Sequence, residues 1–575
     1  MIRALALAAA AWAAAAWGQE EDAGEIADLE VAVEVDAGIP DAGLPEAPRP
    51  HLIEPSPVEI ATRVDATTTT IGAWHTGNNN RTSCDDNYGE LLERLNVNGS
   101  HGNWVAGARL DASAYANRPR NSMVSGLPRP CLEVELNHRF ENTLLPEKLW
   151  LSWSNGLFEF TAGDSYVSFG RGLALSLRKT DELGLDNTQR GLRAKINTDR
   201  FTGTLVAGFT NIGNLDESSG RTENDPNDLL VAGQADVRLF NGVRLGGHVV
   251  SFMFRQPVSS SVTPGIDRAF QERWLNVGPT FDAPRLTRWL GLYLEGIGQF
   301  RRNIDGTLHS GFGFYGNSTI HLAPFTILLE GKAYGDLAVV QPRFESPEFQ
   351  PVQYTAPPTV ERLLQEIEHP QANVFGGRVK VDYSINNNLA VFVNGGVFKD
   401  DEGFLDPDTV DIKPGTIIDP YLGLDARFGL VRVQATGGWR TVYIPQYASP
   451  IRSDGHLDIS AVVGFGRGHS IEFHWLHLER KKVLPFTQDA WREGTLQLGY
   501  RLRPWFGVSG ILDYTTEAGM PNEWYPGGTA EVNLTEASSI RLFVGSSRGG
   551  LKCVSGVCRI FPPFSGAKAT VALRF

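Results

Sequence analysis

The sequence predicts an all-β protein, a transmembrane antiparallel β-barrel of about 24 strands, with 22 or 26 strands as alternatives. Three observations support this prediction. From about Thr67 onward, stretches of roughly ten residues alternate between apolar and polar side chains, which is the strand signature of such barrels. Short connections between these stretches alternate with long ones. The chain ends on an alternating stretch that closes with Phe575.

The alternation has a period of two, which indicates strands with one apolar and one polar face. In "GLRAKIN" the apolar side chains are Leu192, Ala194 and Ile196, and Arg193, Lys195 and Asn197 lie between them. The same separation occurs in "FTILLEGKAYGDL", which begins at Phe325, and in "VRVQATGGWR", which begins at Val431. In a barrel of this kind the apolar face meets lipid and the polar face lines the interior.

The connections distinguish a membrane barrel from a soluble sandwich. Tight turns on one edge and long loops on the other are typical of a transmembrane barrel, with the turns in the periplasm and the loops outside. The short connections are centred on residues 155–156, 198–200, 240–242, 386–388, 466–468 and 503–505, and the long ones span roughly residues 212–227, 255–270, 338–370, 400–417 and 548–565.

The strand count follows from the parity of the barrel. Pattern alone gives about 25 candidate strands, but a barrel with both termini in the periplasm needs an even number. Residues 132–140, "LEVELNHRF", alternate well, yet keeping them as a barrel strand would invert the order of turns and loops after them. We therefore assign this segment to a hairpin outside the barrel.

The N-terminal region divides into two segments ahead of a barrel at residues 63–575. Residues 1–18 have a charged start, an apolar run and a small-x-small site, which predicts a cleaved secretory signal peptide. Residues 19–62 form an acidic, Pro- and Ala-rich linker that we expect to be disordered; residues 19–57 hold 11 acids and one Arg. The acidity of the chain therefore belongs largely to this segment, and nothing basic indicates a nucleic-acid partner.

The four cysteines of the exported chain predict disulfides, because an even number of cysteines in an oxidising compartment is typical of paired thiols. Proximity favours Cys553 with Cys558, which leaves Cys84 with Cys131. The C-x4-C spacing lacks an accompanying His or second thiol pair, so we expect no zinc site there.

The last strand supplies a class resemblance. Ala567, Ala569, Val571, Leu573 and Phe575 share one face, and the barrel interpretation turns them toward lipid with Phe575 at the periplasmic interface. In this respect the chain resembles outer-membrane β-barrels as a class. The resemblance implies that Phe575 is part of the signal read by the outer-membrane barrel assembly machinery.

Residues 158–196 carry a more specific resemblance. The sequence "FEFTAGDSYVSFGRGLALSLRKTDELGLDNTQRGLRAKI", together with "RGGLKCVSGVCR" near the end, resembles an uncharacterised family of bacterial outer-membrane barrels. The positions that carry the resemblance are Gly163, Asp164, Tyr166, Phe169, Gly170, Gly172, Leu173, Leu175, Gly184, Asp186 and Asn187. The family is a domain of unknown function, so the resemblance implies a fold and no activity.

Residues 166–188 are long for a loop and combine glycines with charges of both signs. Glycines permit tight bends, and mixed charges suit a polar lumen wall, so we expect this loop to fold into the barrel as a constriction. The alternative is a mobile surface loop. The residues assigned to the constriction are Tyr166, Phe169, Gly170, Arg171, Gly172, Arg178, Lys179, Asp186 and Asn187.

The sequence offers no enzyme motif of the G-x-S-x-G or H-E-x-x-H type, and we expect neither an enzyme nor a cofactor or metal. His469, His474 and His477 lie on one segment, but on a strand His474 points away from the other two.

The lumen face suggests a pore. Its projected basic residues outnumber its acids, and rings of Arg bias a pore toward anions. These residues include Arg193, Lys195, Arg378, Lys380, Arg432, Arg440, Arg501 and Arg503. The favoured function is therefore a pore for polar, including anionic, solutes. The alternative is a non-conducting structural or interaction platform.

Overall fold

The structure is a computed structural model of the chain. It describes residues 62–77, 86–118, 140–216, 222, 225–240, 242–255, 272–303, 305–338, 354–360, 373–406, 411–484, 487–518, 520, 522–554, 557–561 and 563–575. Arg63–Arg574 forms one compact unit. The signal peptide, residues 19–61 of the predicted linker, Cys84, Cys131 and residues 132–139 of the expected outer hairpin lie outside the described residues.

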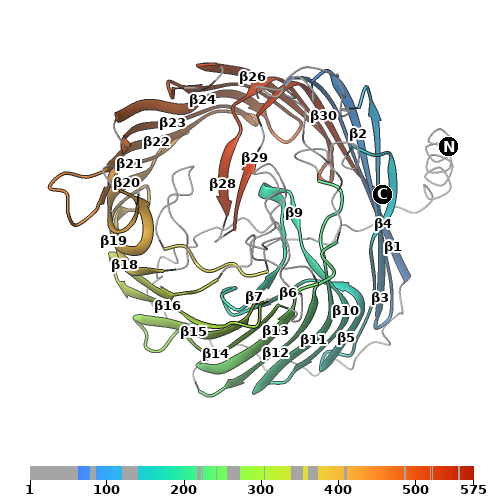
Figure 1. The fold of residues 1–575 in the computed structure, drawn as a ribbon. Coiled ribbons are helices and arrows are strands. Elements are labelled where there is room, and N and C mark those ends of the chain that lie inside the picture. The colour runs from blue at the N-terminus through green and yellow to red at the C-terminus, as the bar shows by residue number, and fades with distance from the viewer. Residues whose placement is uncertain are drawn as a thin grey trace, which may run out of the picture. The chain divides into compact units, whose positions relative to one another are not determined.

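The architecture is a closed antiparallel barrel of 24 strands, as the sequence predicts (Figure 1). Every barrel strand pairs with its neighbours along the chain, and β1 pairs with β30 to close the cylinder. The barrel strands are β1 (Thr62–Gly77), β2 (Tyr88–His101), β3 (Trp104–Ala116), β4 (Thr143–Ser154), β5 (Phe158–Ser165), β10 (Thr188–Asn197), β11 (Phe201–Asn211), β12 (Leu229–Arg238), β13 (Arg244–Met253), β14 (Arg273–Ala283), β15 (Leu290–Arg302), β16 (Leu308–Leu322), β17 (Phe325–Gly335), β18 (Val374–Asn386), β19 (Leu389–Leu405), β20 (Ile412–Phe428), β21 (Val431–Tyr443), β22 (Arg452–Gly466), β23 (His469–Leu484), β24 (Thr487–Leu502), β25 (Phe506–Thr515), β26 (Trp524–Thr535), β27 (Ser538–Ser547) and β30 (Phe564–Arg574).

One predicted connection is wrong. Residues 400–417 were expected to form a long loop, but β19 continues to Leu405 and β20 begins at Ile412. The register shifts after Asp400, and pairing then resumes between Phe404 and Lys413. An irregularity of this kind bends a hairpin without ending it, and it interrupts the alternation from which strands are recognised.

The apolar faces of the strands point outward, as the sequence predicts, and the exterior of the barrel is therefore apolar. Leu192, Leu329 and Trp439 are among the exposed large apolar side chains, whereas the intervening Lys332 and Arg440 are buried inside. A closed barrel with such an exterior hides its backbone polar groups and shows acyl chains an apolar wall. The protein therefore has the architecture of a transmembrane β-barrel.

Aromatic side chains lie on the outer face near both ends of the strands. Toward the long loops, the rings of Tyr514 and Trp524 lie 5.8 Å apart. Toward the tight turns, Trp153 and Phe160 stack at 6.0 Å. Two such aromatic belts are what a transmembrane barrel places at the two lipid interfaces.

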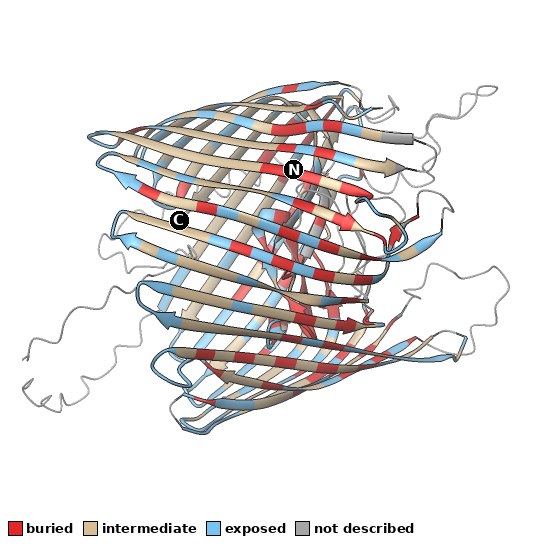
Figure 2. Cartoon of the chain, turned by 90° about the vertical axis from the view of Figure 1, so that its left-hand side faces the viewer, coloured by how far each residue is buried: buried red, intermediate tan, exposed pale blue. Residues whose placement is uncertain are grey.

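Burial within the barrel is uneven. The buried residues gather in the half of the strands next to the long loops, and the half next to the tight turns is more open (Figure 2). Among the described residues, the helical structure is a single short 3-10 turn, and no helix is long and apolar enough to cross a membrane. The long-loop half of the interior is therefore filled by something other than the wall itself.

Candidate functional site: the loops inside the lumen

Among the described residues, three segments in the interior of the barrel pack on one another. The first, the lumen loop, is residues 166–188 and contains β6 (Val167–Phe169), β7 (Leu175–Leu177), β8 (Lys179–Thr180), a 3-10 turn (Asp181–Leu183) and β9 (Leu185–Asp186). The second, the strap, is residues 354–360. The third, the C-terminal hairpin, is β28 (Gly550–Val554) and β29 (Val557–Phe561). Figure 1 shows β6, β7, β9, β28 and β29 inside the ring of barrel strands.

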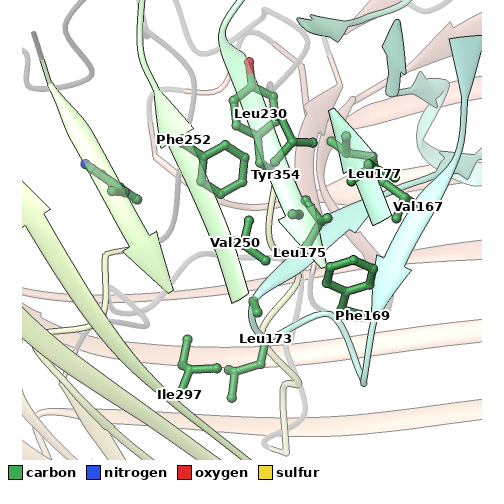
Figure 3. Close-up of a cluster of buried hydrophobic side chains, with 14 of the residues drawn as sticks. Val167, Phe169, Leu173, Leu175, Leu177, Leu230, Val250, Phe252, Ile297 and Tyr354 are labelled. Atoms are coloured by element: carbon green, nitrogen blue, oxygen red, sulfur yellow. The ribbon is translucent and has the colours of Figure 1, made fainter. Parts of the chain in front are cut away.

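The lumen loop packs on the inner wall through an apolar underside. Val167, Phe169, Leu173, Leu175 and Leu177 are all buried, and Leu173 and Leu175 are 0% exposed (Figure 3). Their partners on the wall are Val206, Leu230, Val250, Phe252 and Ile297. Each such side chain contributes about 2 kcal/mol when it leaves water, so the underside as a whole fixes the loop against the wall.

Glu295 of β15 receives the tip of the lumen loop. The backbone N–H of Arg171 donates to Glu295 Oε2 at 2.7 Å, and the hydroxyl of Tyr293 donates to the same oxygen at 2.7 Å. Gly170 has a φ of 55°, and a Cβ at this position would lie 2.5 Å from the Glu295 carboxyl carbon. The site therefore requires glycine at position 170, both for the backbone conformation and for space.

Asp186 holds the far end of the lumen loop. It forms ion pairs with Arg109 of β3 and Lys148 of β4, and the hydroxyl of Tyr166 donates to it at 2.7 Å. Arg109 Nε also donates to Asp111 at 2.8 Å, so the wall carries a buried ionic network at this point.

The network sets the protonation state of Asp186. Burial by itself raises the pKa of Asp186, but the charges of Lys148 and Arg109 and the bonds from Lys148 and Tyr166 lower the pKa to about 2. Burial and the neighbouring Asp186 raise the pKa of Tyr166. Asp186 is therefore an anion and Tyr166 a neutral donor across the physiological range.

The strap crosses the lumen loop and ties it to the wall. Ser176 N donates to Tyr354 O at 2.8 Å, and Ala356 N donates to Gly172 O at 2.8 Å. The buried hydroxyl of Tyr354 donates to Asp228 Oδ2 at 2.8 Å. The strap and the lumen loop therefore form one hydrogen-bonded body.

The C-terminal hairpin closes over the same body. Arg559 Nη1 donates to Leu183 O at 2.9 Å, and its other terminal nitrogen pairs with Asp216. Phe561 packs against Leu183, Leu185 and Ala356, so all three segments meet in one small apolar cluster. We call this assembly of lumen loop, strap and C-terminal hairpin the interior plug.

The chain is similar to proteins of known structure in its barrel fold alone. No family model and no curated protein matches the chain. Among solved structures, the siderophore receptor PirA from Pseudomonas aeruginosa matches with 9% identity and a TM-score of 0.45, covering 90% of this chain and 81% of that one. The PapC usher translocation pore matches with 8% identity and a TM-score of 0.42, covering 89% of this chain and 99% of that one. The outer membrane protein OpdK from Pseudomonas aeruginosa matches with 10% identity and a TM-score of 0.34, covering 70% of this chain and 96% of that one. Likenesses this weak carry no argument about substrate or mechanism, and the resemblance to an uncharacterised family stays a prediction.

The structure brings most of the predicted constriction residues into the plug. Phe169, Gly172, Asp186 and Asn187 are buried, and Gly170 at the loop tip is exposed. Asn187 N donates to Arg178 O at 3.3 Å, while the exposed Lys179 pairs with Asp181 at 2.6 Å. The exposed Arg171 lies over the ring of Tyr293, at 4.9 Å from its centroid.

The predicted basic lumen residues face inward, but they lie beside acids. Arg440 and Asp419 form an ion pair whose side chains are 1% and 3% exposed. Lys380 pairs with Asp382 at 2.8 Å. Pairs with acids also involve Arg193, Arg378, Arg432, Arg501 and Arg503. Lys195 lies opposite Glu159 and Thr204 in the strand register.

The three histidines of β23 diverge. His474 faces Asp458 in the lumen at 3.0 Å. His469 and His477 lie beside Tyr500 and Tyr514 at 2.7 and 2.5 Å on the outer face.

The C-terminal hairpin brings one predicted cysteine pair together at the level of the backbone. Cys553 and Cys558 lie directly opposite each other in the register of β28 and β29. Their side chains are outside the described residues, so the disulfide stays a prediction, as does the Cys84–Cys131 pair.

Proposed function

We propose that this barrel is a pore for small polar solutes whose passage is narrowed by the interior plug. The observation that carries the proposal is the division of the lumen into two halves. The half next to the long loops holds an anchored apolar plug, and the half next to the tight turns is lined with polar and charged side chains. A barrel of this strand number encloses a wide interior, and loops that fold inward set how much of it conducts.

The ion pairing of the lumen supports weak rather than strong selectivity for charge. Rings of Arg favour anions when their charge is not neutralised, and here the predicted cations are largely paired with carboxylates. We therefore extend the proposal to polar solutes in general, with anions among them.

Conductance in planar bilayers tests the proposal. We expect the refolded chain to give steady but small current steps. A variant in which residues 167–187 are replaced by a short Gly-Ser linker should give clearly larger steps, because it lacks the lumen loop. A matched control shortens the 516–523 connection between β25 and β26, which belongs to none of the three plug segments, and should leave the step size unchanged. Equal current steps for the wild-type chain and the variant without residues 167–187 would contradict a narrowing role for the lumen loop.

The alternative function is a structural or interaction platform with a closed lumen, and one observation favours it. All three plug segments meet in a cluster that includes Leu183, 0% exposed, and Leu185, 2% exposed. This alternative would be supported if the correctly folded wild-type barrel gave no current steps and the variant without the lumen loop did. We also propose that Phe575 serves the barrel assembly machinery.

A further inference from the structure

Two arginines lie directly opposite each other on the outer face of the barrel. Arg273 begins β14 and Arg302 ends β15, and the two residues are partners in the strand register. Side chains alternate along a strand, so Arg273 shares the outward face with the exposed Leu275, and Arg302 shares it with the exposed Phe300. The intervening Trp274 points inward, into the buried cluster of the wall.

The charges of this pair are not balanced by an acid on the same face. Like charges that are directly opposite in an antiparallel pair destabilise it, because the two Cβ atoms are only about 5 Å apart. Arg273 forms no ion pair with a described residue. The carboxylates of β13 to β16 are Asp282 and Glu295, and both lie at inward positions. Arg255, two residues beyond the end of β13, is exposed and adds another positive charge at this end of the strands.

Two other outward cations near the long loops have an acid beside them. On β23 and β24, Glu479 and Arg492 are register partners and form an ion pair at 3.2 Å. On β19, Lys399 pairs with Asp401 at 2.6 Å. At Arg273 the register partner is a second arginine in place of an acid, so the charge pattern requires an anion from outside the chain.

The position of the two arginines indicates which anion this is. Both lie at the strand ends next to the long loops, where the outer face also carries the aromatic belt. Toward the middle of the barrel, the adjoining outward side chains are Leu275, Phe300 and Phe312, which are 38%, 55% and 54% exposed. Guanidinium groups bind phosphate oxygens in a bidentate geometry, and the apolar wall beside them faces acyl chains. A phosphate group that is attached to acyl chains satisfies both conditions.

We propose that Arg273 and Arg302 bind the phosphate group of a lipid in the membrane leaflet next to the long loops. The acyl chains of that lipid lie along Leu275, Phe300 and Phe312. Basic residues at the edge of a membrane-spanning surface are suited to anionic headgroups, because charge attraction adds to the burial of the acyl chains. The site is on the exterior, so it is independent of whether the lumen conducts.

Native mass spectrometry of the refolded barrel in detergent tests this site. The probe is diphosphoryl lipid A, and the comparison ligands are the same lipid without its phosphates and inorganic phosphate. We expect the wild-type chain to retain diphosphoryl lipid A and to bind the other two much more weakly. Equal binding of the dephosphorylated lipid would show that the acyl chains alone decide, and equal binding of inorganic phosphate would show a site for small anions. Either result would overturn the proposal.

Variants of the pair separate lipid binding from barrel stability. Arg273→Gln and Arg302→Gln should each weaken the binding of diphosphoryl lipid A about fivefold, because each removes one cation from the headgroup site. Arg273→Glu creates a cross-strand pair of the kind formed by Glu479 and Arg492, so it should leave the barrel at least as stable while it weakens lipid binding further.

The matched control is Arg492→Gln, which removes an outward arginine of β24 and should keep the wild-type affinity for the lipid. Heat-modifiable gel mobility should be retained in all four variants, which shows that the barrel still closes. Wild-type affinity in Arg273→Glu would contradict the proposal, and so would an equal loss of affinity in Arg492→Gln.

Discussion

Arg559 and Asp216 form an ion pair whose side chains are both 0% exposed, although 343 residues separate them in the chain. Arg559 also donates to Leu183 O, so one guanidinium joins the C-terminal hairpin, the 212–228 connection and the lumen loop. A buried pair that loses one partner leaves an uncompensated charge, which is far more costly than the pair is stabilising.

Arg559→Ala should therefore detach the C-terminal hairpin. We expect the free energy of local opening of residues 550–561 to fall by about 3–5 kcal/mol, measured by hydrogen exchange of their amides. Lys179→Ala breaks the exposed pair with Asp181 and should change protection by less than about 1 kcal/mol. Unchanged protection in Arg559→Ala would show that the hairpin is held elsewhere.

Gly170→Ala should loosen the tip of the lumen loop. The new Cβ meets the carboxyl group of Glu295, and the left-handed backbone alone costs a non-glycine residue about 1–2 kcal/mol. We expect faster cleavage between Leu177 and Leu185 in limited proteolysis on intact cells. Gly395→Ala, whose Cβ would meet nothing within 4 Å, is the control and should be cleaved at the wild-type rate. Rapid cleavage of the wild-type chain itself would favour the mobile-loop alternative.

Acid should weaken the attachment of the lumen loop through Asp186. The pKa of Asp186 is lowered from 3.8 to about 2 in the folded chain. The ionised carboxylate therefore stabilises the loop fully at pH values above 3.8, and this stabilisation is lost as the pH falls through the pKa of the folded chain. The contribution is about 2 kcal/mol, and it should disappear between about pH 5 and pH 2. The loss of stabilisation is measured as a fall in the hydrogen-exchange protection of the amides of residues 166–188, after correction for the intrinsic exchange rate at each pH. Asp186→Asn should remove the pH dependence, and a wild-type loop whose protection is flat to pH 2 would rule out Asp186 as the anchor.

Removal of lumen carboxylates should shift the pore toward anions. Glu330→Gln and Asp425→Asn leave Arg378 and Arg432 without these acidic partners. We expect reversal potentials in a salt gradient to move in the anion-selective direction for both variants, and to be near zero for the wild-type chain. Glu479→Gln neutralises an acid whose pair with Arg492 is exposed, and it serves as the control. A wild-type pore with strong anion selectivity would show that the ion pairs do not neutralise the lumen.

The sequence predicts the barrel well because strand alternation is local. The face of Leu192, Leu329 or Trp439 follows from its immediate neighbours, and the strand number follows from parity once residues 132–140 are set aside. A break in alternation, as after Asp400, is where the prediction fails, because the period is then lost over only a few residues.

The interior plug was harder to predict because its contacts are not local. Nothing near Arg559 indicates Asp216, and nothing near Tyr354 indicates the lumen loop. One signal was present: β12 and β13 carry apolar residues on both faces, with Leu230, Val250 and Phe252 at inward positions. A lumen wall that is apolar must be covered, so runs such as "LLVAG" and "HVVSFMF" indicate where a loop lies against it.

An experimental density map of the refolded barrel in a lipid nanodisc tests the central claim most directly. We predict continuous density for residues 166–188 inside the cylinder, against the inner faces of β11 to β15, with the carboxyl group of Glu295 at the loop tip. A closed barrel with these residues outside an empty lumen would contradict the account.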